Sequence, residues 1–244
     1  MSAHGDIWAA AEWPSGWQVR HLDETGSTNA DLLVDLDAGL AGDRSVLVTD
    51  HQTAGRGRLD RRWDAPAGTN LLVSIAVSPV PSVPSEATHR VGLAALFAAR
   101  RARPDAALTL KWPNDLLLEG AKVAGILAQR SSSTDSLVVG LGLNIGWAPE
   151  AAARLGGSTS PAELVSAILA ELDELPSDIG PMYRSELSTI GCRVRLEVPD
   201  HSGNRFVEGR AVDVDDQGRL LVATDSGATT AYDVGDVVHV RPSA

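Results

Sequence analysis

An arginine-rich segment is the part of this sequence whose residue types most clearly indicate chemistry. It runs from His51 to Trp63 and reads HQTAGRGRLDRRW, with Gly55 and Gly57 on either side of its first arginine. Its four arginines are Arg56, Arg58, Arg61 and Arg62. Guanidinium groups bind carboxylates and phosphates through paired hydrogen bonds, and glycine lets backbone N–H groups approach the same ligand. The segment therefore predicts a binding site for an anion.

A solvated loop held by ion pairs is the alternative for this segment, with Asp60 and Asp64 as acidic partners. Four arginines against two aspartates leave an excess of two positive charges. The excess is unusual here because the chain has 32 acidic and 21 basic side chains and a formal net charge of -11. Such a charge repels nucleic acid and anionic membranes. We therefore expect no nucleic-acid or membrane partner, and a small anion at the arginines.

The expected cellular location rests on three features that the sequence lacks: a membrane span, a secretory signal and a pair of cysteines. Its longest apolar runs are far shorter than the roughly 20 residues that span a bilayer. The N-terminus shows no basic region followed by an apolar one, as a secretory signal would. The single cysteine, Cys192, cannot form an internal disulfide, which fits a reducing compartment. We expect a cytoplasmic protein.

Several common catalytic patterns are missing from the sequence. It contains no G-x-x-x-x-G-K-[ST] phosphate loop, no complete dinucleotide fingerprint, no nucleophile elbow and no H-E-x-x-H zinc motif. The six histidines are scattered singly, and a lone histidine is more often structural than a metal ligand. Hydrolase, zinc-enzyme and dinucleotide-binding functions are therefore disfavoured, and no resident metal is predicted.

Two short strands are expected to position the arginine-rich segment. Ser45–Thr49 leads into it and Asn70–Val77 follows it, so the segment is a loop on a rigid scaffold. A strand at Gln18–Leu22 comes before them, and Ser27 or Thr28 is placed to cap a helix. Taken alone, the Ser-Thr-Asn triplet at this point would be only that cap.

The middle of the chain alternates helical and extended patterns. A buried helix is predicted from Ser85, and its last turn carries Arg100, Arg101 and Arg103, which fit a helix C-terminus better than a site. Further predicted elements are strands at 107–112, 116–118, 122–129 and 136–145, and helices at 160–175 and 180–190. Ser160 and Glu163 match a capping box at the first of these helices.

The sequence pattern changes after Gly191, where five short predicted strands alternate with turns. This spacing predicts a small all-β barrel of about fifty residues. We expect three parts: a short, loosely structured lead-in at residues 1–17, a main domain at residues 18–189, and the barrel domain at residues 190–244. No pattern assigns an oligomeric state.

Five motifs in this order resemble the biotin protein ligase family. They are Ser27-Thr28-Asn29, the GRGR core within Gln52–Trp63, KWPND at Lys111–Asp115, K-x-A-G at Lys122–Gly125 and G-x-G-x-N at Gly140–Asn144. Each is weak alone, but five in order are specific, and with the C-terminal strands the resemblance covers roughly residues 18 to 241.

The resemblance implies a fold and a reaction. The fold would be α+β, with a mixed sheet flanked by helices as in class II aminoacyl-tRNA synthetases and lipoate ligases, followed by an SH3-like β-barrel. Biotin and MgATP would give biotinyl-5'-AMP and pyrophosphate. A lysine of a biotin carboxyl carrier domain, part of a biotin-dependent carboxylase, would then take the biotinyl group. Some members carry an N-terminal DNA-binding domain; the residues before Trp17 are too few for one, so we expect a form without it.

The resemblance also implies site residues. The catalytic residues would be Lys122, Arg58 and Asp115. Biotin would contact Ser27, Thr28, Asn29, Gln52, Gly55, Arg56, Gly57, Arg58, Arg61, Trp63, Lys122 and Gly125. ATP would contact Arg56, Arg58, Arg61, Lys111, Asn114, Lys122 and Asn144, with Mg²⁺ arriving with the nucleotide. Asp115 is either the base that deprotonates the acceptor lysine or an anchor for the turn that follows it.

Two other functions remain open at this stage. Lipoate or octanoyl transfer uses the same scaffold, although the complete GRGR loop, KWPND and the C-terminal strands favour biotin. A catalytically silent biotin or nucleotide sensor is the second, and Lys122 together with the arginines argues against it.

Overall fold

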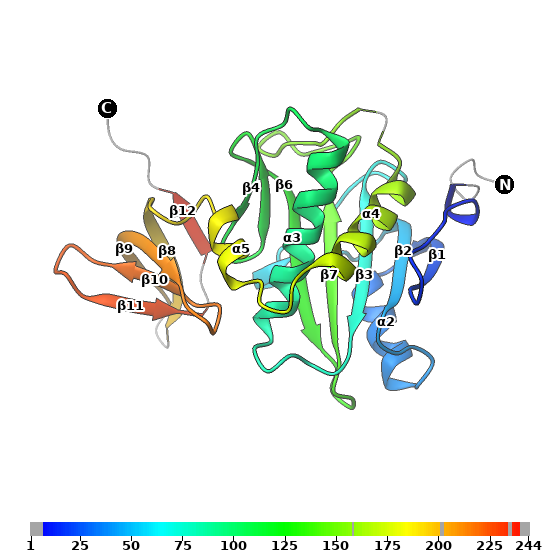
Figure 1. Cartoon of the computed structure of the whole chain (residues 1–244), viewed down its shortest axis with the longest axis horizontal. Helices are drawn as coiled ribbons and strands as arrows, with labels where there is room; N and C mark the ends of the chain where they lie inside the picture. The colour runs from blue at the N-terminus through cyan, green and yellow to red at the C-terminus, as the bar shows by residue number, and fades with distance from the viewer. Residues whose placement is uncertain (1–6, 158, 201–202, 234–235, 240–244) are drawn as a thin grey trace.

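The computed structural model describes residues 7–157, 159–200, 203–233 and 236–239, which form two β-sheets with helices packed on the larger one (Figure 1). The larger sheet has the strand order β1-β2-β3-β7-β6-β5-β4. Its strands are β1 (Gln18–Thr25), β2 (Ser45–Gln52), β3 (Leu71–Val77), β4 (Leu108–Lys111), β5 (Asp115–Leu118), β6 (Ala121–Arg130) and β7 (Leu137–Leu143). The β1–β2 pair is parallel and the other pairs are antiparallel, which confirms the predicted mixed sheet.

Helices cover both faces of this sheet (Figure 1). They are α2 (Thr28–Asp37) on one face and α3 (Ser85–Ala102) and α4 (Pro161–Glu174) on the other, and α5 (Gly180–Glu186) packs beside α3 near the small sheet. Side chains alternate between the two faces along each strand. Val46 and Val139 pack in the large core with α3 and α4, whereas their neighbours Leu47 and Val138 pack with Leu32 of α2. The sheet is therefore the middle layer of three.

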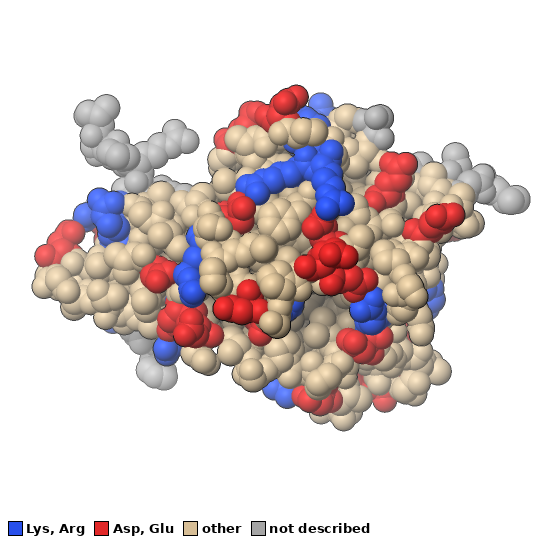
Figure 2. Space-filling model, viewed as in Figure 1, with Lys and Arg blue, Asp and Glu red and all other residues tan. Residues whose placement is uncertain are grey.

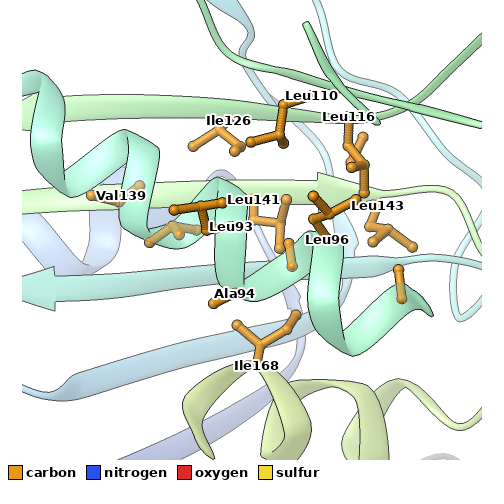
Figure 3. Close-up of a cluster of buried hydrophobic side chains, with 14 of the residues drawn as sticks. Leu93, Ala94, Leu96, Leu110, Leu116, Ile126, Val139, Leu141, Leu143 and Ile168 are labelled. Carbon is orange, nitrogen blue, oxygen red and sulfur yellow. The ribbon is translucent and has the colours of Figure 1, made fainter. Parts of the chain in front are cut away.

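The large core lies between the sheet and α3. Figure 3 shows Leu93 and Leu96 from α3 beside Leu141 and Leu143 from β7, with Ile168 of α4 nearby. All five are at most 2% exposed. Burying a leucine or isoleucine side chain contributes about 1.5–3 kcal/mol, so this layer holds the site-bearing strands in place.

A second, antiparallel sheet with the order β11-β10-β9-β8-β12 ends the chain. Its strands are β8 (Arg193–Asp200), β9 (Gly203–Val214), β10 (Leu220–Ala223), β11 (Thr229–Tyr232) and β12 (Asp236–His239). The five predicted strands are therefore confirmed. Within the described residues no pairing joins β11 to β12, so the sheet is open along that seam. Val194 and Leu220 belong to the same apolar cluster as the core of the larger sheet.

Three local expectations were wrong. The segment before β1 is not loosely structured throughout, because Trp8 is 7% exposed and stacks on Trp13 and His21. Ser160 is the N-cap of α4, but its side chain makes no capping hydrogen bond. α5 ends at Glu186, short of residue 190, because the next residues pair with β4 through backbone contacts.

The surface over α3 and α4 mixes acidic and basic side chains (Figure 2). Arg100 and Arg101 near the end of α3 each lie 2.6 Å from a carboxylate, those of Glu186 and Glu171. These arginines are thus paired surface residues, as predicted. No helix of the described chain is both long and apolar enough to cross a membrane.

Candidate active site

A cavity of about 350 Å³ lies against the larger sheet and collects most of the predicted site residues. Those that line it are Ser27, Thr28, Asn29, Gln52, Arg56, Gly57, Arg58, Arg61, Trp63, Asn114, Asp115, Lys122, Gly125 and Asn144. They come from the start of α2, the arginine-rich segment, the β4–β5 turn, β6 and the end of β7. Five motifs separated in sequence therefore meet at one place.

Two predicted contact residues do not line the cavity. Gly55 is buried, and a Cβ atom there would lie 2.4 Å from the Trp63 carbonyl oxygen and 2.9 Å from Gln52 Nε2. Its own carbonyl accepts the Trp63 N–H at 3.0 Å. Gly55 is therefore required by close backbone packing. Lys111 ends β4 opposite Asp115 in the strand register, outside the cavity lining.

The arginine-rich segment folds back on itself. Arg56 and Arg62 form an antiparallel bridge, and the Gly57 N–H donates to the Arg61 carbonyl at 2.7 Å. A 3-10 turn at Arg58–Asp60 connects the two sides. Of the two acidic partners considered for an ion-paired loop, Asp64 has its Oδ2 atom 3.9 Å from Arg62 Nε with both side chains exposed, and the side chain of Asp60 lies outside the described part, so the ion-pair alternative is not tested.

Glycines form the floor beneath this segment. Gly125 and Gly142 are directly paired across β6 and β7. A Cβ atom at Gly142 would lie 2.4 Å from Trp63 Cε2, and one at Gly125 would lie 3.2 Å from Trp63 Cζ3. The indole ring therefore lies against Gly125 and Gly142, on two neighbouring strands. Of the alternating glycines of β7, Gly142 thus leaves room for the Trp63 ring, whereas Gly140 leaves room for the side chain of Asn29.

One end of the cavity is charged. Lys122 Nζ lies 2.5 Å from Asp115 Oδ1 and 5.8 Å from the centre of the Trp63 ring. Arg58 Nη1 donates a hydrogen bond to Asn114 Oδ1 at 3.2 Å, and Asn114 Nδ2 donates to the Ile126 carbonyl at 2.7 Å. These contacts connect the arginine-rich segment to the KWPND turn and place Lys122 beside a carboxylate.

The other end is neutral and polar. The backbone N–H and the hydroxyl group of Thr28 lie 2.9 and 3.0 Å from Gln52 Oε1. Asn29 Nδ2 donates to the Leu127 carbonyl at 3.1 Å. Ser27 is the N-cap of α2, and its side chain makes no capping hydrogen bond. Ser27, Thr28 and Asn29 all line the cavity, so the triplet is more than a helix cap.

Sequence reasoning missed several residues here. Ser74 of β3 lies behind Thr28 and Asn29, and Gln129 of β6 contacts Asn29. Ser74 had a weak signal, as a polar residue inside the apolar run LLVSIAV. The remaining lining residues that were not predicted are Leu59, Arg62, Asp64, Val73, Ile126, Leu127, Gly140, Leu141, Gly142, Pro149 and Ala152.

Asn144 is 3% exposed and lines the cavity near its charged end. Its Nδ2 donates to the Ala153 carbonyl at 3.0 Å, and its Oδ1 accepts from Asn70 Nδ2 at 3.2 Å. These bonds fasten the end of β7 to the following loop. A contact of Asn144 with the nucleotide or its metal stays a prediction.

Among the described residues, carboxylates that can bind a metal line the cavity and also lie outside it. Asp64 and Asp115 provide carboxylates in the cavity. Outside the cavity, His21, Asp23 and Asp50 of β1 and β2 place their ligand atoms within 4.8 Å of one another.

Comparisons with known proteins agree with this geometry. Residues 25–145 match the biotin/lipoate A/B protein ligase family, and residues 189–240 match the biotin protein ligase C terminal domain. A biotin--[acetyl-CoA-carboxylase] ligase of Mycobacterium tuberculosis is 41% identical over 93% of this chain and 91% of its own length. A bifunctional ligase/repressor of Escherichia coli is 28% identical, covering 86% of this chain and 70% of the relative.

Solved structures share the fold. A biotin protein ligase from Aquifex aeolicus in complex with biotin and ATP aligns with a TM-score of 0.76 and 24% identity, covering 92% of this chain and 99% of that one. One from Leishmania major in complex with biotinyl-5-AMP aligns with a TM-score of 0.61 and 23% identity, covering 91% and 100%. With a relative 41% identical along nearly its whole length, this chain belongs to the biotin protein ligase family.

Proposed function

We propose that this chain is an ATP-dependent ligase that activates biotin as biotinyl-5'-AMP and transfers the biotinyl group to a lysine of a carrier domain. One observation carries the proposal: a single cavity joins a neutral polar end at Thr28 and Gln52 to a cationic end at Arg58 and Lys122. A ligand with a polar ring and a carboxylate at its far end fits this order of groups. Family membership agrees with it.

The first step brings together two anions, the biotin carboxylate and the triphosphate of MgATP. A carboxylate oxygen attacks the α-phosphorus, the bond to pyrophosphate breaks, and biotinyl-5'-AMP forms. Arg56, Arg58 and Lys122 would neutralise the charge that develops on the phosphate oxygens. A fixed donor at such a position lowers the barrier by about 3 kcal/mol. Magnesium enters with the nucleotide in this proposal, and Asp64 and Asp115 are the oxygen ligands that the cavity offers it.

The ring of biotin would occupy the neutral end. Its ureido group offers both N–H donors and a carbonyl acceptor, which suit the amide and hydroxyl groups of Thr28, Asn29 and Gln52. Trp63, held against Gly125 and Gly142, would provide an apolar wall for the rest of the ligand.

In the second step the acceptor amine attacks the acyl carbon, the bond from that carbon to the phosphate oxygen breaks, and AMP leaves. The amine must lose a proton, and Asp115 would accept it. Asp115 lies 2.5 Å from Lys122 Nζ, so the two side chains form an ion pair before ligands arrive. A phosphate that binds Lys122 competes for the ammonium group and would release the Asp115 carboxylate for this task.

The acceptor would be a biotin carboxyl carrier domain of a biotin-dependent carboxylase. Its Mycobacterium tuberculosis relative is named for acetyl-CoA carboxylase. A cytoplasmic location suits both the proposed substrates and the lone Cys192.

Lipoate ligation is the competing activity, since the matched family includes lipoate ligases. A sensor that binds biotin without reacting is another. One experiment separates all three: incubate the protein with MgATP, a carrier domain and either biotin or lipoate, and measure the mass of the carrier. A biotinyl mass gain supports the proposal. A lipoyl gain, or no adduct despite biotin binding, would replace it with the first or second alternative.

A further inference from the structure

Three side chains that can bind a metal ion meet at the edge of the larger sheet, and we call them the His–Asp–Asp cluster. They are His21 and Asp23 on the edge strand β1 and Asp50 on β2 (Figure 1). The parallel register of these strands places Asp23 level with Asp50, and His21 shares a face of β1 with Asp23. Their ligand atoms all lie within 4.8 Å of one another, and none of the three residues lines the cavity. Strand pairing, and not sequence spacing, therefore brings them together.

The two carboxylates of this cluster carry like charges. Like charges on directly opposite residues of neighbouring strands destabilise a sheet. Within the described part of the chain, no arginine or lysine forms an ion pair with Asp23 or Asp50. Asp50 accepts the indole N–H of Trp8 at 3.2 Å, which is a neutral donor. Two carboxylates against one histidine leave the cluster negative in either protonation state of the ring.

The His21 ring has a nitrogen atom that no protein group satisfies. Its Nε2 atom is buried and has no hydrogen-bond partner among the described residues. Asp50 Oδ1 lies 3.2 Å from this nitrogen, but the direction of approach does not suit a hydrogen bond. Trp8 stacks on the imidazole with ring centroids 5.2 Å apart, which restrains the ring. A buried polar atom held in place without a partner is unfavourable unless a ligand satisfies it.

A divalent metal ion accounts for these features together. Zn²⁺ binds imidazole nitrogen and carboxylate oxygen at about 2.0–2.2 Å, so two ligand atoms of a tetrahedral site lie about 3.4 Å apart. The 3.2 Å between His21 Nε2 and Asp50 Oδ1 is close to this spacing. The side chain of Asp23 is exposed, so it can turn to close the remaining distance. Three protein ligands leave a fourth position for water.

We propose that His21, Asp23 and Asp50 form a binding site for one zinc-like divalent metal ion. The site is separate from the cavity and from the magnesium of the proposed reaction. Imidazole suits Zn²⁺ and its neighbours among the transition metals, whereas Mg²⁺ and Ca²⁺ take oxygen ligands. Trp8 orients the Asp50 carboxylate through its N–H, as a supporting hydrogen bond does for a ligating carboxylate. The ion would join β1, β2 and the segment before β1.

The test measures metal binding to the whole chain after treatment with a chelator, in buffer that contains excess Mg²⁺ to fill sites built only from oxygen ligands. Calorimetry should give a Zn²⁺ site with a micromolar dissociation constant. Co²⁺ at the same site should show the intense visible absorption of a four-coordinate ion. Zn²⁺ at about 100 times its dissociation constant should raise the melting temperature by about 5–10 °C.

Variants assign the ion to this cluster. His21→Gln removes the imidazole nitrogen and should weaken Zn²⁺ binding by about a hundredfold or more. Should this variant fail to fold, Asp23→Asn alters an exposed side chain and should weaken binding by about tenfold or more. Trp8→Phe keeps an aromatic ring beside His21 but removes the N–H that orients Asp50, so the affinity should fall about tenfold.

His51→Gln is the matched control. His51 Nδ1 lies 2.8 Å from Glu24 Oε2 on the same two strands, and no third ligand joins this pair within the described residues. Zn²⁺ affinity in this variant should equal that of the wild type.

The outcomes distinguish this inference from the proposed function. A wild-type chain that binds no Zn²⁺ would overturn the metal site. Equal Zn²⁺ affinity in the wild type, His21→Gln and Asp23→Asn would place the ion elsewhere and overturn it as well. Biotinylation of a carrier domain with MgATP is measured on the same samples. Its failure, together with Zn²⁺ binding that depends on His21, would defeat the proposed function alone.

Discussion

Lys122 combines two contacts that differ in physical kind. Its ammonium group forms an ion pair with Asp115 at 2.5 Å and lies 5.8 Å from the centre of the Trp63 ring. The carboxylate is a partner that a phosphate can displace, whereas the ring face attracts any cation and excludes water. Lys122 is thus held near the place where we propose the acyl phosphate forms, and Asp115 is held within reach of it.

The role of Asp115 as a base is tested by Asp115→Asn. The amide keeps the shape of the side chain but cannot accept the amine proton, so we expect transfer from preformed biotinyl-5'-AMP to slow by about 10²–10⁴-fold. Quenched-flow measurement of carrier biotinylation gives this rate. A variant that transfers at the full wild-type rate would leave Asp115 with only its structural role at the β5 turn.

The glycine floor makes a second residue-scale prediction. Gly142→Ala would place a methyl group 2.4 Å from the present position of Trp63 Cε2, so the ring must move and biotin should bind at least tenfold more weakly. Calorimetry measures this change. Adding Trp63→Phe provides a smaller ring and should restore part of the loss. Gly42→Ala, where nothing lies within 4 Å, is the matched control.

At the scale of elements, the arginine-rich segment is a folded strap between β2 and β3. Its two sides are joined by the bridge from Arg56 to Arg62, and Leu59 at its tip has a φ of 54°. Arg58 connects the strap to the KWPND turn through Asn114. An acyl adenylate hydrolyses in water, so a strap that closes over it would protect it. An open strap without ligand stays a prediction.

Arg58→Gly should loosen this strap. It removes the bond to Asn114 and one positive charge beside the adenylate, so we expect biotinyl-5'-AMP to escape and label lysines of bystander proteins. Mass spectrometry of a mixture with an unrelated lysine-rich protein would detect the labelling. Retention of the intermediate as firm as in the wild type would contradict this role.

How far the sequence predicts the fold depends on the range of the contacts. Short continuous apolar runs predict β2, β3 and β7 well, because each strand's pattern is local. Local patterns do not predict structure that depends on a residue far away in the sequence. Leu187 pairs with Leu110 and is not part of the helix, and Trp8 is buried against His21. Whether β11 pairs with β12, which it does not do within the described residues, likewise depends on strands that meet only after folding.

The residues of the candidate site likewise differ in whether the sequence predicts them. Motif residues such as Arg58 and Lys122 were predicted because family resemblance marks them, and the cavity collects them. Gly55 was predicted to contact the ligand, but its place in the motif has another explanation: the Trp63 carbonyl oxygen lies too close for any larger side chain. Ser74 and Gln129 were missed because they act on Asn29 from 45 and 100 residues away along the chain. No spacing rule connects positions so far apart.

At the scale of the whole molecule, the two sheets share one apolar cluster. The indole N–H of Trp112, in the KWPND motif, donates to the Gly218 carbonyl at 3.0 Å in the small sheet's β9–β10 turn. A Cβ atom at Gly218 would lie 2.9 Å from His89 Cε1 on α3. The small sheet is therefore fastened beside the site, and we propose that the boundary near Thr189 separates two parts that unfold together.

The buried His89 side chain at this junction makes the stability of the protein depend on pH. Burial lowers the pKa of His89 from 6.5 to about 4, while its ring stacks on Tyr183 of α5 with centroids 3.8 Å apart. The unfolded chain binds this proton more readily, so stability is complete above pH 6.5 and is lost as pH falls from 6.5 towards 4. The shift corresponds to about 3 kcal/mol.

Urea unfolding at a series of pH values tests this. We expect the free energy of unfolding of the wild type to fall across that window, and His89→Gln to flatten most of the slope there. Carboxylates with lowered pKa values, such as Asp37 and Asp215, act at more acidic pH and should be unaffected by the substitution. Parallel curves for wild type and variant would exclude His89 as the source.

The paired glycines under Trp63 also limit how this cavity can change. Glycine has the smallest side chain, so every substitution at Gly125 or Gly142 makes the cavity shallower and none makes it deeper. A variant that accepts a bulkier ligand must therefore gain its space from the walls, at Trp63, Val73 or Leu127. The backbone of the sheet therefore limits how deep the cavity can be, and substitutions of wall residues can change only its width.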